Sequence, residues 1–129
     1  MARRFLPLLA GAVIALVAVL PATASPTAAQ TLTLAVNSDA FKITLTSGSS
    51  KVTSVKPGTY TFKLVDKTAI HNVDLLKGST TVKDTKGKPV MTSVSGKESK
   101  SVTVKLAKGS YTFHCDPHAS TMKGTLKVA

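Results

Sequence analysis

The sequence has one cysteine, no tryptophan and only six acidic residues among its 129 positions. One cysteine cannot form an internal disulfide, so the cross-links that stabilise many small exported domains are excluded. Arginine occurs only at positions 3 and 4. Because arginine makes most of the bidentate contacts to bases and phosphates, its absence from the rest of the chain argues against nucleic-acid binding.

The chain is nevertheless basic. All fifteen lysines lie in residues 30–129, and against six acidic residues they give this part a net charge of +9. Many of them alternate with apolar residues, which is typical of the solvated outer face of strands, where lysine also protects sheet edges from aggregation. A second interpretation, compatible with the first, is that this positive field helps to dock an acidic partner.

The N-terminus has the pattern of a secretory signal. Arg3 and Arg4 precede an almost wholly apolar run at residues 5–20, and the next nine residues are small and polar. This order predicts a signal peptide over residues 1–29. We therefore expect export to the periplasm, the cell surface or the extracellular medium.

Two details of this segment stay open. The A-x-A pattern allows cleavage after Ala24 as well as before Gln30. The apolar run could also stay as an uncleaved membrane anchor, although it is shorter than the roughly 20 residues that a spanning helix usually needs. Residues 30–129 are enough for one domain with a single core, and we expect that domain to be a monomer.

Apolar residues alternate with polar ones along most of this domain. The alternating positions are Leu32, Leu34 and Val36; Phe41, Ile43 and Leu45; Tyr60, Phe62 and Leu64; Val102, Val104 and Leu106; Tyr111, Phe113 and Cys115; and Leu126 and Val128. Turn-forming glycines and prolines separate these segments, and no stretch has a sustained helical period. The pattern predicts an all-β fold, a sandwich or barrel of about seven or eight strands. Residues 77–99 are predicted to form a loop with short edge strands near residues 80–83 and 90–94.

One turn-and-strand unit occurs twice. The sequence PGTYTFKL at residues 57–64 is echoed by KGSYTFHC at residues 108–115. The first unit leads toward His71 and the second ends on Cys115, so these two residues would meet at one end of the fold if the two strands were neighbours. Chance is an equally good explanation, because similar hairpins arise easily in β proteins.

The most informative segment is CDPHASTM, residues 115–122, which places a thiolate, an imidazole and a thioether in one short loop. The donors are Cys115, His118 and Met122, and His71 could add a second imidazole. Two imidazoles, one thiolate and a weak axial thioether select copper and favour electron transfer over hydrolysis. The spacing therefore predicts a copper site.

Each donor also has a plainer interpretation. His71 could be a hydrogen-bonded core histidine, Met122 could fill the core, and Cys115 could be an inert buried thiol. Metal binding is favoured because all four residue types occur together, in the required order, in a chain with one cysteine and three histidines. The third histidine, His114, alternates onto the outward face of its strand and is interpreted as a surface residue.

The set of His71 and Asn72, followed by Cys115-x2-His118-x3-Met122 before a last strand, resembles the cupredoxins of the plastocyanin and amicyanin type. The resemblance covers nearly all of residues 30–129 and implies a Greek-key β-sandwich with one mononuclear type 1 copper ion. It makes His71, Cys115 and His118 the equatorial ligands and Met122 the axial one. It further implies that Asn72 links the two ligand loops, and that the His118 ring passes electrons through an apolar patch.

The sequence also departs from that family. The interval from His118 to Met122 is one residue shorter than in plastocyanins and one longer than in amicyanins, and His114 replaces a tyrosine at the second electron-entry surface of plastocyanins. The acidic patch beside that tyrosine has no counterpart here. These differences argue against a photosynthetic plastocyanin role and favour a bacterial cupredoxin.

The predicted function is that of a one-electron carrier, not an enzyme, which cycles between Cu(II) and Cu(I) and serves a redox protein partner. Copper storage or delivery by the same ligands is the main alternative. A thiol enzyme with Cys115 as nucleophile lacks an evident residue to orient its histidine. A structural zinc site is disfavoured by the methionine.

Overall fold

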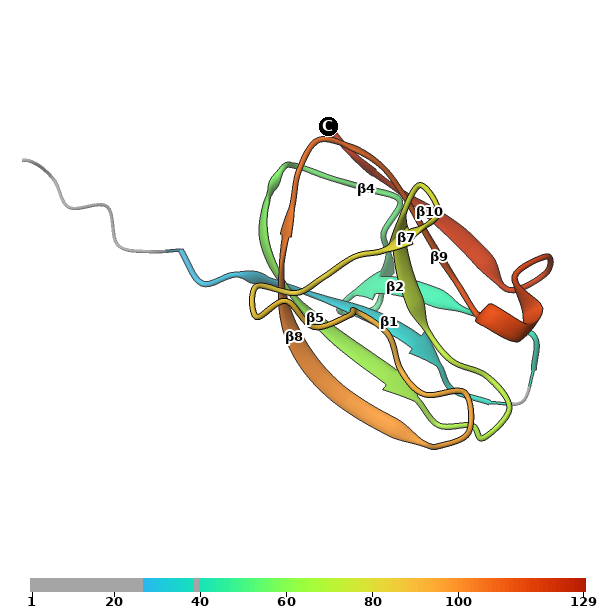
Figure 1. Ribbon diagram of the computed structural model, residues 1–129. Helices are drawn as coiled ribbons and strands as arrows, with labels where there is room; N and C mark the ends of the chain where they lie inside the picture. The colour runs from blue at the N-terminus through green and yellow to red at the C-terminus, as the bar shows by residue number, and fades with distance from the viewer. Residues whose placement is uncertain (1–26, 39) are drawn as a thin grey trace, which may run out of the picture.

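The computed structural model describes residues 27–38 and 40–129, which form two five-stranded sheets (Figure 1). The first sheet has the order β3-β2-β1-β5-β8 and consists of β1 Gln30–Val36, β2 Thr44–Ser47, β3 Ser50–Lys51, β5 Gly58–Asp66 and β8 Glu98–Leu106. The second has the order β4-β10-β9-β6-β7 and consists of β4 Ser54–Val55, β6 Asp74–Lys77, β7 Thr80–Thr81, β9 Gly109–His114 and β10 Lys123–Val128. A single turn of 3-10 helix, η1, covers Asp116–His118 in the described part.

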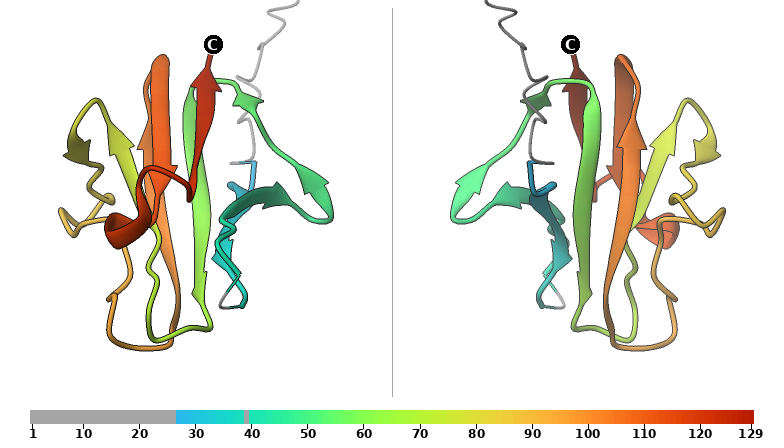
Figure 2. Two further views of the ribbon diagram at one scale, coloured as in Figure 1. Left: turned by 90° about the vertical axis from the view of Figure 1, so that its right-hand side faces the viewer. Right: turned by 90° about the vertical axis from the view of Figure 1, so that its left-hand side faces the viewer.

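The predicted all-β sandwich is confirmed. The chain crosses between the sheets several times, and the long strands run along the length of the molecule (Figure 2). Most neighbours are antiparallel, whereas β1 pairs with β5 and β10 with β4 in parallel. Ten strands appear in the described residues, more than the seven or eight predicted, because β3, β4 and β7 have only two residues each. Within the same residues, no helix is long and apolar enough to cross a bilayer.

The core lies between the sheets and contains the alternating apolar side chains that the sequence singles out. Its fully buried members include Leu32, Leu34, Phe62, Leu64, Val104 and Leu126. Burial of one face of each strand provides the main driving force for this arrangement, since apolar area removed from water stabilises by about 25 cal/mol per Å².

Phe41 does not follow the predicted alternation. Its segment was expected to form a strand with Ile43 and Leu45, but β2 begins only at Thr44 and the Phe41 side chain is 60% exposed. A lysine at position 42 and the SD pair before it favour a turn over a strand, so the period-two pattern is too short here to be decisive. Phe41 instead lies at the end of the molecule that carries the candidate metal donors.

The two copies of the repeated unit begin in the same way. The Tyr60 hydroxyl donates to the Lys56 carbonyl at 2.7 Å, and the Tyr111 hydroxyl donates to the Ala107 carbonyl at 2.9 Å, four residues upstream in both cases. The strands β5 and β9 nevertheless belong to opposite sheets, so the premise that they are neighbours is wrong. The second unit is joined to the His71 region by the pairing of β6 with β9 instead.

Within residues 77–99, Lys77 ends β6 and Glu98 begins β8, and the segment between them is a loop with one short strand, β7, as predicted for its first half. No strand occurs at residues 90–94, where the only pairing is an isolated bridge between Asp74 and Met91. Val90 is fully buried and packs against the core cluster. The Leu75 amide donates to the Val90 carbonyl and the Thr92 amide to the Val73 carbonyl, at 3.1 and 2.9 Å. These backbone bonds and the buried Val90 side chain hold this polar segment on the sandwich although it lacks a regular period.

Candidate metal centre

His71 lies in the loop between β5 and β6, and a hydrogen-bonded turn fixes its backbone. The Asp66 carboxylate accepts bonds of 2.9 Å from both the amide and the hydroxyl of Thr68. The Thr68 hydroxyl then accepts the His71 amide at 3.2 Å. All three residues are almost completely buried. Burial makes such a fully bonded polar turn rigid, because each group would be costly to leave unpaired.

Cys115 directly follows β9 and opens a tightly closed loop. Its amide donates to the Met122 carbonyl at 3.0 Å, which brings the two ends of the loop together. Inside the loop, the amides of His118 and Met122 donate to the carbonyls of Cys115 and His118 at 3.0 and 2.8 Å. Pairing of β9 with β10 holds the loop from both sides.

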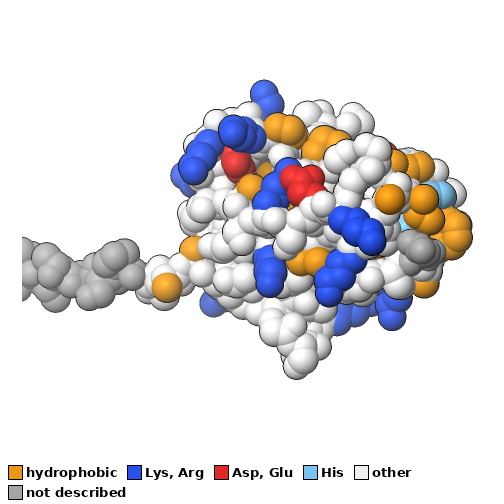
Figure 3. Space-filling model, turned by 90° about the horizontal axis from the view of Figure 1, so that it is seen from below, with side chains coloured by type: hydrophobic (Ala, Val, Ile, Leu, Met, Phe, Trp, Pro, Cys, Tyr) orange, Lys and Arg blue, Asp and Glu red, His pale blue; other side chains and the backbone are white. Residues whose placement is uncertain are grey.

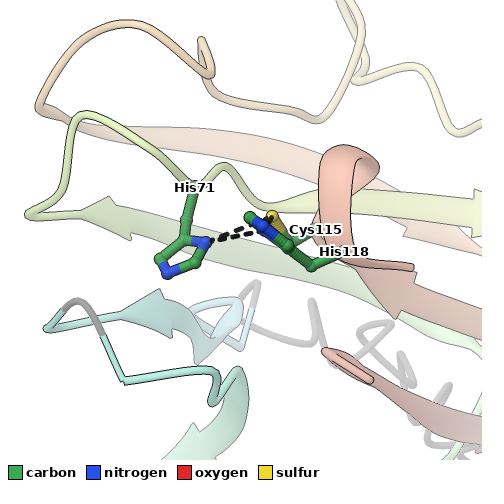
Figure 4. Close-up of side chains that lie close together, drawn as sticks. All are labelled: His71, Cys115 and His118. Carbon is green, nitrogen blue, oxygen red and sulfur yellow. Dashed lines mark hydrogen bonds between the residues drawn. The ribbon is translucent and has the colours of Figure 1, made fainter. Parts of the chain in front are cut away.

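The side chains of His71, Cys115 and His118 point toward one another (Figure 4). The two Nδ1 atoms are 3.0 Å apart, and Cys115 Sγ lies 3.7 Å from Nδ1 of His71 and 3.5 Å from Nδ1 of His118. Cys115 and His71 are fully buried, while His118 is half-buried.

These three distances fit one metal ion. A triangle with sides of 3.0, 3.5 and 3.7 Å has a centre about 2.0 Å from each corner, close to the bond length between imidazole nitrogen and a first-row metal ion, roughly 2.0–2.1 Å. One soft thiolate with two imidazoles is the donor set that suits copper in a trigonal site. The residues present therefore fit a copper ion.

Backbone hydrogen bonds hold Met122 beside these donors. Its side chain is 1% exposed and belongs to the same buried cluster as Cys115. Its carbonyl accepts the Cys115 amide and its own amide donates to the His118 carbonyl. The predicted axial ligand therefore lies buried in the closed loop.

Asn72 links the two ligand loops, as the family resemblance implies. Its amide nitrogen donates to Asp116 Oδ2 at 2.7 Å, and its carbonyl oxygen accepts the Asp116 amide at 2.8 Å. Asn72 is fully buried. Because it follows His71 and Asp116 follows Cys115, this pair of bonds sets the two donors in register.

Phe41 covers the outer side of the histidine pair, and the sequence did not reveal this role. Its ring packs edge-to-face on His118, with centroids 4.8 Å apart, and on His71, with centroids 5.3 Å apart. A large apolar residue in the polar stretch NSDAFK was the only available signal. Its position limits the access of water to the exposed edge of the donor set.

A second group of polar side chains lies beside the loop. His114 Nε2 is 2.9 Å from Asp116 Oδ1 and 3.9 Å from Asp74 Oδ2. The prediction that His114 is an outward surface residue is only partly right, since the side chain is half-buried and held between two carboxylates. Burial raises the pKa of the Asp74 carboxyl; a hydrogen bond from Thr81 opposes this shift, and the charge of Asp116 adds to it.

A β-sandwich that gathers two imidazoles and a buried thiolate at one end defines the cupredoxin class of blue copper electron carriers. Residues 32–129 match the family described as copper binding proteins of the plastocyanin/azurin family, so the chain belongs to that family. Copper is accordingly the cofactor of this class of site.

Solved structures support the same fold. The structure of reduced rusticyanin is 17% identical, with a TM-score of 0.52 over 80% of this chain and 82% of rusticyanin. The structure of auracyanin B is 24% identical, with a TM-score of 0.50 over 82% of this chain and 93% of auracyanin B. No curated protein sequence matches the chain significantly.

Proposed function

We propose that this protein is an exported one-electron carrier with a mononuclear type 1 copper site. In this proposal His71, Cys115 and His118 are the equatorial ligands and Met122 is the axial ligand. The observation that carries it is the triangle of donor atoms, whose sides match a single ion bound about 2.0 Å from each. Bound copper would supply a centre that accepts and returns one electron.

The surrounding residues favour transfer over chemistry on a substrate. The hydrogen-bonded turn before His71 and the closed loop from Cys115 to Met122 hold the donors in fixed positions. Burial of Cys115 and His71 keeps water and substrates away from the thiolate. Donors that do not rearrange suit a site that changes oxidation state, which favours a carrier over an enzyme.

The same burial favours electron transfer over copper storage or delivery. Release of copper to an acceptor needs an approach to the ligands, and two of the three converging donors have no exposed surface. A carrier should survive repeated oxidation and reduction with its copper retained. Rapid loss of Cu(I) to a chelator or an acceptor protein would instead support delivery.

Loading of the purified domain with Cu(II) tests the site. We expect an intense visible thiolate-to-copper band that reduction abolishes and reoxidation restores. Cys115→Ser should be colourless while its far-ultraviolet circular dichroism stays that of a folded β protein. A wild-type protein that holds one copper without the visible band would contradict a type 1 site.

We further propose that the end bearing His118 docks a redox protein. On the face that Figure 3 shows, apolar side chains gather beside histidine side chains, and lysines are spread over the rest of that face. Phe41 and Ile70, next to the histidine ligands, are 60% and 49% exposed. A monomer could present this apolar end to its partner, with lysines attracting an acidic rim.

Salt dependence tests the contribution of the lysines. The rate of association with an acidic redox protein should fall as salt is added, because screening shortens the range of the positive field. A rate that does not change with salt would leave the lysines without a role in docking. Fractionation of the producing cells, with detection of the domain outside the cytoplasm, tests export.

A further inference from the structure

We propose that Asp74, His114 and Asp116 form a second metal site, for a divalent ion of borderline softness such as Zn(II), beside the copper ligands and distinct from them. The three side chains offer two carboxylates and one imidazole, with one ligand atom from each within 4.8 Å of the others. This inference does not depend on the proposed electron-carrier function.

Strand pairing brings these side chains together. Asp74 of β6 lies directly opposite His114 of β9 in an antiparallel pair, so both side chains project from the same face of the sheet. Asp116 follows two residues after His114, and its carboxylate turns back toward the histidine. The sheet thus places Phe113 toward the core and the side chains of Asp74 and His114 on its other face.

The distances are close to those of a coordinated ion. Two donors bound at about 2.1 Å and separated by angles of about 90–120° lie roughly 3.0–3.6 Å apart. His114 Nε2 is 2.9 Å from Asp116 Oδ1 and 3.9 Å from Asp74 Oδ2. A shift of about half an ångström in the His114 ring would therefore equalise its two contacts around one ion.

Asp74 provides an independent indication. Its side chain is 5% exposed, and its Oδ1 atom is buried without a hydrogen-bond partner among the described residues. Its Oδ2 atom accepts the Thr81 hydroxyl at 3.0 Å. A buried carboxylate oxygen that lacks a partner is costly, and a bound cation is one of the few groups that can remove this cost.

The other two ligands are oriented and reachable. Asn72 donates to Asp116 Oδ2, which fixes the carboxylate with Oδ1 facing His114. His114 is half-buried and Asp116 is exposed, so an ion can enter from solvent and keep water as additional ligands.

The donor set selects the class of ion. Imidazole combined with carboxylates suits Zn(II) and other late first-row ions, whereas Ca(II) and Mg(II) prefer sites made of oxygen alone. The absence of sulfur also separates this site from the one at Cys115, which attracts softer copper. Zn(II) is therefore the appropriate probe.

The test uses protein already loaded with Cu(I), so that the first site is filled before Zn(II) is added. Equilibrium dialysis with elemental analysis should find one zinc per protein in addition to one copper. Asp74→Asn and His114→Gln should each weaken zinc binding roughly tenfold or more, because each removes one of three ligands. Asp84→Asn, which changes an aspartate in the loop at residues 84–88, should bind zinc like the wild type.

The outcomes separate this proposal from the function of the copper site. The visible spectrum of Cu(II)-loaded His114→Gln should stay that of the wild type, which would show that the lost zinc site is not the copper site. The absence of a second equivalent, or zinc binding that survives both variants, would overturn the proposal. Copper content is measured separately, so a failure of the first site is recognised independently.

Discussion

Asn72 and Asp116 are joined by two hydrogen bonds, one in each direction, of 2.7 and 2.8 Å. They connect the loop that carries His71 to the loop that begins at Cys115. The fully buried side chain of Asn72 is the link between segments that are more than forty residues apart in the sequence. The spacing of the copper donors therefore depends on a residue that is not itself a ligand.

Asn72→Ala should destabilise the domain by about 2–3 kcal/mol, because two hydrogen bonds are lost and a backbone amide is left unpaired. The unfolding free energy from urea titration measures this loss. Asn37→Ala, at an exposed asparagine in the loop after β1, should change stability by less than about 0.5 kcal/mol. Equal effects of the two substitutions would show that the link contributes nothing.

Met122→Leu should keep the blue colour and raise the reduction potential. A thioether stabilises Cu(II) weakly from the axial position, so its replacement by a hydrocarbon favours Cu(I). Met91→Leu is the matched control, since Met91 lies on the loop after β7 and not in the ligand loop. Redox titration of the two variants decides the matter, and a potential unchanged by Met122→Leu would remove Met122 from the ligand set.

Phe41→Ala should lower the reduction potential with little change in stability. Loss of the ring lets water approach the histidine edges, and water stabilises the more highly charged Cu(II) state. The free energy of unfolding should change by less than about 0.5 kcal/mol, because the side chain is 60% exposed. Phe41→Leu keeps an apolar cover, so its reduction potential should stay near that of the wild type. If Phe41→Leu lowered the potential as much as Phe41→Ala does, access of water would not be the cause.

Gly124→Ala should destabilise the domain by about 1–3 kcal/mol, a typical cost of overpacking. A Cβ atom at Gly124 would clash with the Phe113 ring, which crosses this position from the paired strand. Gly96→Ala, where a Cβ atom meets nothing within 4 Å, is the control. Thermal unfolding should separate the two variants by several degrees, and coincident melting curves would refute the close contact.

Glu98→Gln should reduce stability slightly at neutral pH and not at all in acid. The 2.7 Å ion pair with Lys100 lowers the pKa of the Glu98 carboxyl, so its contribution is present above the unfolded value of 4.5 and is lost as the pH falls through the folded value. Both side chains are about one-third exposed, which limits the effect to under about 1 kcal/mol. Unfolding at pH 7 and pH 3 measures it, and an equal difference at both values would exclude the pair as the cause.

The strands could be predicted because one buried face leaves a period of two in the sequence. Leu32, Leu34, Phe62 and Leu64 follow this rule and are fully buried. The rule does not say which sheet receives each strand, so the similarity between β5 and β9 suggested neighbours where the structure has opposite sheets. Sheet assignment depends on contacts between distant segments, which a local pattern does not encode.

The convergence of His71, Cys115 and His118 could also be predicted, because the chemistry of a soft metal needs these residue types together. The residues that surround these donors could not be predicted. Phe41 reaches the site because of the loop that carries it, and Asp74 because of the strand pair to which it belongs. Neither residue has a signal in the sequence beyond its residue type. Their positions become visible only when the fold is known.

The direction of β1 has a practical consequence. Its last residue, Val36, pairs with Asp66 beside the His71 loop, whereas its first, Gln30, pairs with Tyr60 at the other end of the sheet (Figure 1). Seven residues of strand span roughly 20 Å. A tether fused ahead of Gln30, whether a lipid, a resin or an electrode linker, would thus leave the histidine-bearing end pointing into solution and free to meet a second protein.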